Sequence, residues 1–235
     1  MGKGLFKKAH FRIAGDCGLL VEYGDAIHPD VNHKVRSMGI ILEKEIPKGV
    51  VEIIPTYRSI LIFYDPFITT PGRLKQILIE QEKRLPEIKI PPPKLVEIPV
   101  CYGGAFGPDM DFVASVHGIN EADVIRFHSE ADYLIYMVGF TPGFPFLGGL
   151  PDILHTPRLE TPRTMVPAGS VGIANAQTGI YPVSSPGGWR IIGRTPIRLF
   201  DPNRKNPILY QAGDIIRFRA ITEKEYQQLF TAETG

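Results

Sequence analysis

Residues 136–196 decide the fold: they read YMVGFTPGFPFLGGLP at 136–151 and TPRTMVPAGSVGIANAQTGIYPVSSPGGWRIIGRTP at 161–196. Glycine and proline interrupt this stretch at nearly every third position, and large apolar side chains such as Phe144 and Trp189 lie between them. Because proline pre-sets turns and glycine permits close approach, the pattern is typical of strands joined by shaped loops. The stretch therefore predicts a folded β unit whose loops carry the function.

The surrounding C-terminal half continues this pattern. Two short helices are expected first, one over 107–118 capped by Asp109 or Asp111, and one that begins at Asn120 as its N-cap. A further helix, TEKEYQQLF, is expected at 222–230. The short apolar runs in this half lie at 133–138, 171–174, 190–192, 197–200, 208–210 and 215–220. Several short strands with Gly/Pro turns predict an all-β barrel or sandwich.

The N-terminal part has longer elements. Residues 9–24 give two strands around a turn, a helix follows from Pro29, and a strand pair occupies 49–65. A second helix begins at Thr70, and a strand at 94–102 follows three prolines. From residue 17 this order is β-α-β-β-α-β, the arrangement of ferredoxin-like domains. The sequence thus predicts an α+β protein, with a ferredoxin-like domain at 1–102 and an all-β barrel or sandwich domain at 103–235.

The totals exclude several classes of protein. The chain has 26 Lys and Arg against 25 Asp and Glu, without the basic stripe that a nucleic-acid or membrane-surface binder needs. Its two cysteines, Cys17 and Cys101, lie far apart, which argues against a disulfide framework or a zinc ribbon. No apolar run reaches the roughly 20 residues that span a membrane. We therefore expect a cytoplasmic protein without nucleic-acid or membrane partners.

Familiar catalytic motifs are missing. The sequence has no GxxxxGK[ST], no GxGxxG after a strand and no HExxH, so it identifies neither a nucleotide site nor a metal site. Ser170 lies in AGSVG, which resembles a nucleophile elbow, but the residues after it end in turn chemistry rather than a helix. A turn serine is the better interpretation.

Three basic residues are candidates for polar chemistry. His128 ends the helix that begins at Asn120, where it either interacts with the helix dipole or acts as an acid or base beside the 139–144 loop. Arg163 and Arg194 lie in rigid turns, which suits either bidentate carboxylate recognition or ties to loop carbonyls. The residue types alone leave these alternatives open.

Aromatic residues and one tight turn are candidates for a pocket. Gln177, Tyr181 and Trp189 can line a pocket with one polar tip each, although aromatics in a small barrel are more often core. The turn formed by Pro186, Gly187 and Gly188 permits another backbone or a ligand to approach closely.

These same motifs resemble one family. GFTPGFPFLGGLP at 139–151, the 161–189 stretch and GRTPIRLFDP at 193–202 are similar to the family of 5-oxoprolinase B subunits, also called the KipI or allophanate hydrolase subunit 1 family. IPVCYGGAFGPDM at 98–110 and IIPTYRSILIFYDP at 53–66 match as well, so the resemblance covers nearly the whole chain. It implies a ferredoxin-like domain followed by a cyclophilin-like β-barrel.

The resemblance also implies an activity and partners. Family members act with subunits A and C in the ATP-dependent opening of 5-oxoproline to glutamate, which makes ATP a cofactor of the complex. Alternatives within the family are a regulator that inhibits a sporulation histidine kinase, and an allophanate hydrolase subunit. The last is the weakest, because the sequence offers no Ser-Lys or Cys-His nucleophile pair. A cyclophilin-like fold does not by itself imply isomerase activity.

Carried over by position, the resemblance implies a pocket. Its expected catalytic residues are His128, Arg163 and Arg194. Its expected substrate-binding residues are Gly139, Phe140, Pro142, Gly143, Phe144, Gln177, Tyr181, Pro186, Gly187, Gly188 and Trp189. One departure is Pro145-Phe146, where the family pattern has alanine or serine followed by tyrosine.

Overall fold

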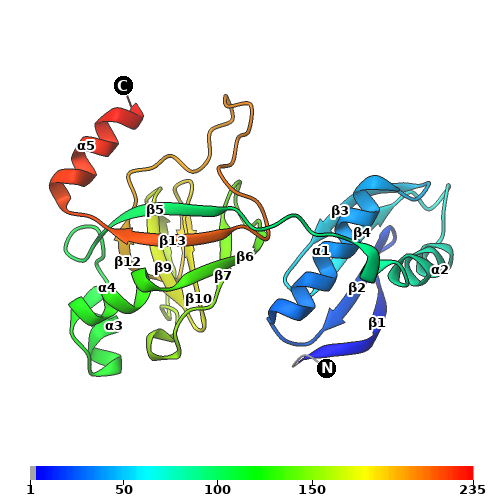
Figure 1. The fold of residues 1–235 in the computed structure, drawn as a ribbon, viewed down its shortest axis with the longest axis horizontal. Helices are drawn as coiled ribbons and strands as arrows, with labels where there is room; N and C mark the ends of the chain where they lie inside the picture. The colour runs from blue at the N-terminus through cyan, green and yellow to red at the C-terminus, as the bar shows by residue number, and fades with distance from the viewer. Residues whose placement is uncertain (1–3, 235) are drawn as a thin grey trace. The chain divides into compact units, whose positions relative to one another are not determined.

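In a computed structural model, which describes residues 4–234, the chain divides into two compact units (Figure 1). The first unit ends at Pro92 and the second begins at Pro93. The first holds an open antiparallel sheet with helices, and the second holds a closed barrel. The predicted α+β class with a C-terminal β-barrel is confirmed.

The N-terminal unit is a four-stranded sheet with the strand order β1-β2-β4-β3. All three strand pairs are antiparallel. Its elements are β1 (Leu5–Ala14), β2 (Gly18–Gly24), α1 (Pro29–Lys44), β3 (Val50–Pro55), β4 (Ser59–Tyr64), α2 (Pro71–Glu82) and the short 3-10 helix η1 (Leu85–Glu87). The predicted helix start at Thr70 is confirmed, since its side chain accepts a hydrogen bond from Arg73 N at 3.3 Å.

The ferredoxin-like arrangement is present with one difference at the sheet edge. The unit β2-α1-β3 has β4 between its two strands, which is the split βαβ arrangement. The edge strand beside β2 is β1, from the N-terminal end of the unit, and not the strand at 94–102. The order in the chain is therefore β-β-α-β-β-α rather than β-α-β-β-α-β.

Period-two patterning explains the core of this unit. Leu19, Val21 and Tyr23 alternate along β2 and are all buried, and β4 buries Ile60 and Ile62 in the same way. They pack in one cluster with the apolar residues of the two helices, which are Val31, Val35, Met38, Leu42, Leu74 and Leu78.

The strand at 94–102 belongs to the barrel, which corrects the predicted domain boundary. As β5 (Leu95–Tyr102), it pairs in parallel with β13 (Ile215–Ala220), and its end pairs with β12 (Arg190–Arg194). The boundary between the units in the sequence falls within the triple proline and not at 102–104. The local pattern of β5 fits either domain, because its partner strands lie about a hundred residues away in the sequence.

The barrel has seven strands in the closed order β10-β7-β6-β13-β5-β12-β9 (Figure 1). A separate two-stranded sheet pairs β11 with β8. The remaining elements are α3 (Met110–His117), α4 (Glu121–Glu130), β6 (Asp132–Val138), β7 (Pro145–Gly148), η2 (Asp152–Leu154), β8 (Arg163–Val166), β9 (Ser170–Ala174), β10 (Gln177–Ile180), β11 (Ser185–Gly187) and α5 (Glu223–Thr234). Of the barrel and the sandwich that the Gly/Pro-rich pattern predicts, the structure has the barrel.

Two predicted helix starts have different outcomes. Asn120 caps α4, since its Oδ1 accepts from Asp123 N at 2.8 Å. Asp109 occupies the N-cap position of α3, but its side chain makes no capping hydrogen bond and points to other partners. Among residues 4–234, no helix is long and apolar enough to cross a membrane.

Candidate functional site

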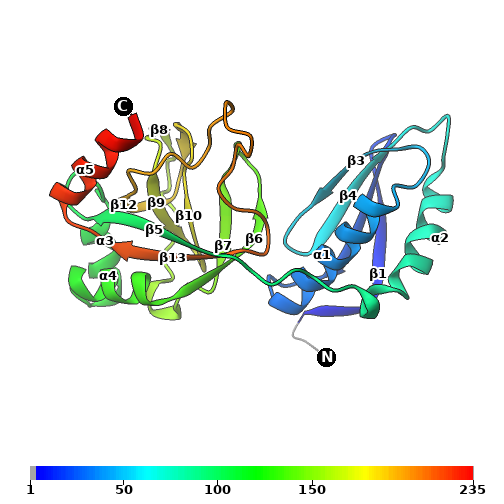
Figure 2. The same cartoon turned by 45° about the horizontal axis from the view of Figure 1, so that its top comes forward.

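Several loops named by the sequence motifs are tied together at the barrel. The Tyr210 hydroxyl donates to the Gly143 carbonyl at 2.8 Å, which fastens the 139–144 loop to the segment before β13. Gly169 N donates to Tyr181 O at 2.7 Å, and Thr195 N donates to Gly169 O at 2.9 Å. Figure 2 shows α5 beside the start of the loop between β12 and β13, with which it lines a common pocket. We call the region built from 139–144, 167–170, 181–189 and 194–210 the loop region.

The predicted aromatic residues meet in this region, as a buried cluster. Phe144 is 1% exposed and lies edge-on to Tyr181 and Trp189, at centroid distances of 5.2 and 5.5 Å. Phe140 lies edge-on to Phe144 at 5.6 Å but is 67% exposed, with a left-handed φ of 70°. The core alternative is therefore the correct one for Tyr181 and Trp189. Phe144, which the resemblance places in the substrate pocket, is buried with them, while Phe140 faces solvent.

The turn at 186–188 receives a side chain. A Cβ atom at Gly187 would overlap the Tyr181 hydroxyl, so glycine is needed for the aromatic ring to lie against β11. Burial raises the pKa of Tyr181, an effect partly offset by a hydrogen bond from the Trp189 backbone and by nearby arginine charges. Pro186 is exposed and Gly188 is half-buried beside it. The close approach predicted here is confirmed, with a tyrosine of the same chain as the approaching group.

Arg163 has a structural role. Its guanidinium donates to Asp109 Oδ1 at 2.9 Å and to the Trp189 carbonyl at 3.3 Å. Asp109 is 6% exposed and also accepts from Ile191 N at 2.6 Å, with Arg190 at 3.8 Å. This network joins the start of α3 to β8 and β12. Of the two alternatives for Arg163, the tie to neighbouring groups is the one that the structure contains.

His128 lies in the barrel core, fully buried. Its ring stacks on Phe218 at 4.5 Å. Thr178 uses its single hydroxyl proton to donate to Gly172 O at 3.0 Å, so it accepts from His128 Nε2 at 2.9 Å. Nδ1 then accepts from the Tyr102 hydroxyl at 2.8 Å. Every polar atom of the imidazole has a partner.

The electrostatics of His128 follow from this burial. Burial lowers the pKa of its imidazole to about 3, so the ring is neutral at pH 7. Burial also holds the pKa of the Tyr102 phenol well above its usual value. A neutral imidazole with both nitrogens hydrogen-bonded inside the barrel does not fit the predicted acid–base role beside the 139–144 loop.

Arg194 is the predicted basic residue that lines a pocket. The pocket has a volume of about 340 Å³ and lies between the loop region and α5. Arg194 Nε donates to Ala168 O at 2.9 Å, and its other nitrogens have no hydrogen-bond partner among residues 4–234. The lining residues are Ala168, Gly169, Pro182, Arg194, Thr195, Pro196, Ile197, Arg198, Tyr226, Phe230 and Glu233.

Sequence reasoning missed the wall that α5 contributes. Tyr226 packs on Phe106 at 4.6 Å and stacks with Phe230 at 6.0 Å. Burial raises the pKa of Tyr226 and the Arg194 cation partly offsets this, so its phenol is protonated beside a positive charge. Glu233 is paired with Arg204 at 3.1 Å. The spacing of Tyr226 and Phe230, four residues apart on a helix, is the signal for a common face.

The remaining predicted residues lie apart from this pocket. Gln177 begins β10 opposite Ala174, at the β9–β10 hairpin. Pro142 is exposed, whereas Gly139 is half-buried and donates to Phe144 O at 3.0 Å. Within the described part of the chain, no three His, Cys, Asp or Glu side chains gather as metal ligands would.

Comparisons with known proteins agree with this fold. The family model "Carboxyltransferase domain, subdomain C and D" matches residues 9–210. The chain is 42% identical to the B subunit of the 5-oxoprolinase of Bacillus subtilis (strain 168) over 224 residues, which is 90% of this chain and 92% of that protein.

Two solved structures extend the comparison. The conserved uncharacterized protein PH0987 from Pyrococcus horikoshii is 45% identical, with a TM-score of 0.56, and the match covers 92% of this chain and all of that one. The K. lactis urea amidolyase is 25% identical, with a TM-score of 0.79 over 96% of this chain, which spans 15% of that much longer protein. The chain therefore belongs to the carboxyltransferase-domain family that includes the 5-oxoprolinase B subunits.

Proposed function

We propose that this chain is the B subunit of an ATP-dependent 5-oxoprolinase, which opens 5-oxoproline to glutamate together with subunits A and C. The observation that carries the proposal is the 42% identity, over nearly the full length of both chains, to the protein named as this subunit in Bacillus subtilis. Identity at this level across both units makes the same role in an assembly the simplest expectation. We expect the protein to act in the cytoplasm.

The pocket at α5 is the proposed place for the substrate. Its volume of about 340 Å³ lies at the small end of the range for ligand sites, which suits a five-membered lactam with one carboxylate. Arg194 has guanidinium nitrogens left over for a bidentate contact to that carboxylate. Arg198 lines the same pocket and adds positive charge, although Asp201 lies 3.6 Å from it.

Tyr226 supplies a second polar group. Its phenol is protonated and near Arg194, and its hydroxyl has no hydrogen-bond partner among residues 4–234. It is therefore suited to donate to the lactam carbonyl oxygen. Opening the ring breaks the amide C–N bond and adds water, and ATP hydrolysis supplies the driving force. Because the sequence has no phosphate-cradling loop, we assign the nucleotide to a partner in the complex.

Reconstitution tests this proposal. The chain is mixed with subunits A and C, and ATP-dependent glutamate release from 5-oxoproline is measured. We expect activity only in the complete mixture. Replacing Arg194 by Ala should lower kcat/KM by about 100-fold, mainly through KM, because a carboxylate contact is lost. Arg194→Lys should recover part of that loss.

The matched control is Arg217→Ala. Arg217 is an exposed arginine on β13 that pairs with Asp132 at 2.6 Å, outside the pocket. It should keep wild-type kinetics. Absence of glutamate release in every combination would contradict the proposed activity, and equal kinetics for the two arginine variants would contradict the assignment of the pocket.

A further inference from the structure

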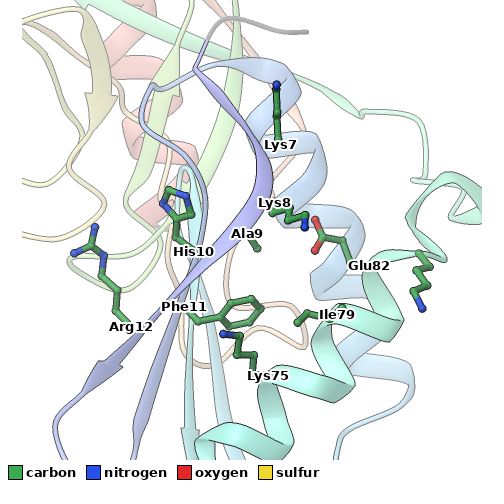
Figure 3. Close-up of a pocket in the computed structure, with 10 residues that line it drawn as sticks. Lys7, Lys8, Ala9, His10, Phe11, Arg12, Lys75, Ile79 and Glu82 are labelled. Atoms are coloured by element: carbon green, nitrogen blue, oxygen red, sulfur yellow. The ribbon is translucent and has the colours of Figure 1, made fainter.

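A large hollow lies in the N-terminal unit, between β1 and α2 (Figure 3). It is an open groove with a volume of about 870 Å³. We call it the β1–α2 groove. Its lining residues are Lys7, Lys8, Ala9, His10, Phe11, Arg12, Lys75, Ile79, Glu82 and Lys83. None of them belongs to the loop region or to the pocket at α5.

The groove follows the open edge of the sheet. Six consecutive residues of β1, from Lys7 to Arg12, line it. Because neighbouring side chains on a strand point to opposite faces, a hollow under one face would be lined by every second residue. Figure 3 shows Phe11 between β1 and α2, with His10 and Arg12 on the other side of the strand. The other edge of β1 is paired with β2, so the edge beside the groove has no strand on it.

The shape suits an extended occupant. The six residues of β1 span roughly 17 Å at the usual rise of a strand. On the opposite wall, the lining residues of α2 recur between Lys75 and Lys83 along about 12 Å of helix. A groove of this length between a bare strand edge and a helix accommodates a chain segment of about four or five residues.

The charge of the groove is strongly positive. Of its cationic side chains, Arg12 pairs with Glu22 at 2.6 Å, and Lys83 pairs with Glu80 at 2.7 Å. Glu82, the one acidic lining residue, is paired with Lys34. Lys7, Lys8 and Lys75 form no ion pair with any carboxylate of residues 4–234. Three lysines thus remain to attract negative charge.

Apolar side chains lie between these charges. Phe11 is half-buried, and Ile79 is 39% exposed on the facing helix. The Lys75 ammonium lies 5.4 Å from the centroid of the Phe11 ring, so one cation is held beside the apolar part of the groove. Figure 3 shows Lys8 further along the strand, near Glu82 at the other end of α2, and Lys7 beyond it. Positive charge is therefore found on both sides of an apolar centre.

We propose that the β1–α2 groove binds an extended acidic segment of a partner protein, which adds as a strand to the free edge of β1. Acidic side chains of that segment meet Lys7, Lys8 and Lys75, and one apolar side chain packs between Phe11 and Ile79. The partner is a further member of the assembly, so this identity of the partner rests on the proposed function. Main-chain hydrogen bonds to the strand edge supply affinity, and the charges supply selectivity.

The lysines have a second possible use that the test must separate from this one. Lysine side chains and β-bulges both discourage unwanted pairing at edge strands, and β1 is irregular between Leu5 and His10. Charge alone serves that purpose, so glutamates at the same positions would protect the edge equally well. An acidic partner segment, in contrast, would be repelled by them.

Charge reversal distinguishes these uses. The triple variant Lys7→Glu, Lys8→Glu, Lys75→Glu is compared with a control of equal charge, Lys48→Glu, Lys89→Glu, Lys94→Glu, whose lysines are all exposed outside the groove and outside the pocket at α5. The dissociation constant for purified subunits A and C is measured by titration calorimetry at two salt concentrations. We expect the groove variant to bind at least about tenfold more weakly, and the control to bind like wild type. Equal binding by the two variants overturns the proposal.

A photocrosslink identifies the occupant directly. p-Benzoylphenylalanine replaces Ile79 in the full chain, and the complex with subunits A and C is irradiated and mapped by mass spectrometry. We expect crosslinks to a partner segment that carries acidic residues around an apolar one. Crosslinks to a second copy of this chain, or none to a partner, overturn the proposal. A shift of the amide signals of residues 7–12 on addition of ATP alone, without the other subunits, also overturns the proposal.

These measurements are independent of catalysis. A complex that assembles and crosslinks at the groove, but releases no glutamate, contradicts the proposed activity and leaves the docking proposal intact. A complex that is active and insensitive to charge reversal at the groove contradicts the docking proposal and leaves the proposed activity intact.

Discussion

The interior of the barrel and the pocket at α5 contain polar residues from the same motifs. The two regions differ in how many hydrogen-bonding groups of those residues are already paired within the chain. In the interior, His128 has both ring nitrogens hydrogen-bonded, to Tyr102 and Thr178, and no access to solvent. At the pocket, Arg194 uses one nitrogen on Ala168 O and keeps the others. A polar residue in a motif is available for binding only where its own fold does not satisfy it.

Removing His128 should produce the largest effect. His128→Ala leaves a cavity and a buried Tyr102 hydroxyl without its acceptor, which we expect to lower the free energy of unfolding by about 3–5 kcal/mol. Trp189 is the single tryptophan and is buried in the barrel unit, so its fluorescence during urea unfolding reports this unit. His33→Ala, at an exposed position of α1, is the control and should change little. A loss below about 1 kcal/mol would mean that the interior is not held by His128.

Asp109 comes next, because it is buried and paired. Asp109→Ala removes the acceptor of Ile191 N and Arg163, and we expect a loss of about 2–4 kcal/mol in the same measurement. Arg163→Ala should lose only about 1 kcal/mol, since its side chain is 31% exposed and Asp109 keeps Ile191 N and Arg190 as partners. Equal losses for the two variants would contradict the larger role of the carboxylate in this network.

A pH dependence sharpens the same contrast. The pKa of His128 is lowered by burial to about 3, below the ordinary value of 6.5 that it regains on unfolding. Between these values the unfolded state binds more protons, so stability falls as the pH falls through this range. From pH 7 to pH 5 we expect the barrel to lose roughly 2 kcal/mol through this group. In His128→Gln this part of the pH dependence should disappear, and an unchanged slope would contradict the burial of a neutral ring.

Arg194 should show the smallest effect on stability. Arg194→Ala removes one hydrogen bond to a carbonyl, and we expect a loss of about 1 kcal/mol or less in the urea measurement. Its effect on substrate binding should be much larger than its effect on folding. If Arg194→Ala unfolds as readily as His128→Ala, the main role of Arg194 is to stabilise the fold and not to bind substrate.

Features that depend on residues close together in the chain are predicted correctly from the sequence, whereas a feature that depends on distant residues is not. Local signals such as the caps at Thr70 and Asn120 predict the helix starts correctly, because a cap involves residues three apart. The Gly/Pro spacing also predicts the short strands of the barrel, because it marks turns between residues that are close in the sequence. The predicted placement of β5 is wrong, since pairing with a strand more than a hundred residues away leaves no trace in the local pattern.

The same distinction between nearby and distant partners applies to the site residues. Phe144, Tyr181 and Trp189 are expected together, and they do meet, because they lie in consecutive loops. Whether a polar side chain in such a loop is already satisfied depends on distant partners. The partner of Arg163 is Asp109, and that of His128 is Thr178, each about fifty positions away. Sequence patterns also miss the contribution of α5 to the pocket, because α5 lies far in the sequence from most of the other lining residues.

The pairing of β5 with β13 also determines the order in which the chain folds. Strands of the N-terminal unit pair within short stretches, as in the hairpins β1–β2 and β3–β4. The first strand of the barrel instead meets its neighbour 120 positions later, where Lys94 N donates to Asp214 at 3.1 Å. Contacts between such distant segments form slowly. During synthesis from the N-terminus, the first unit can fold once its strands have left the ribosome, whereas the barrel closes only after residue 220 has followed.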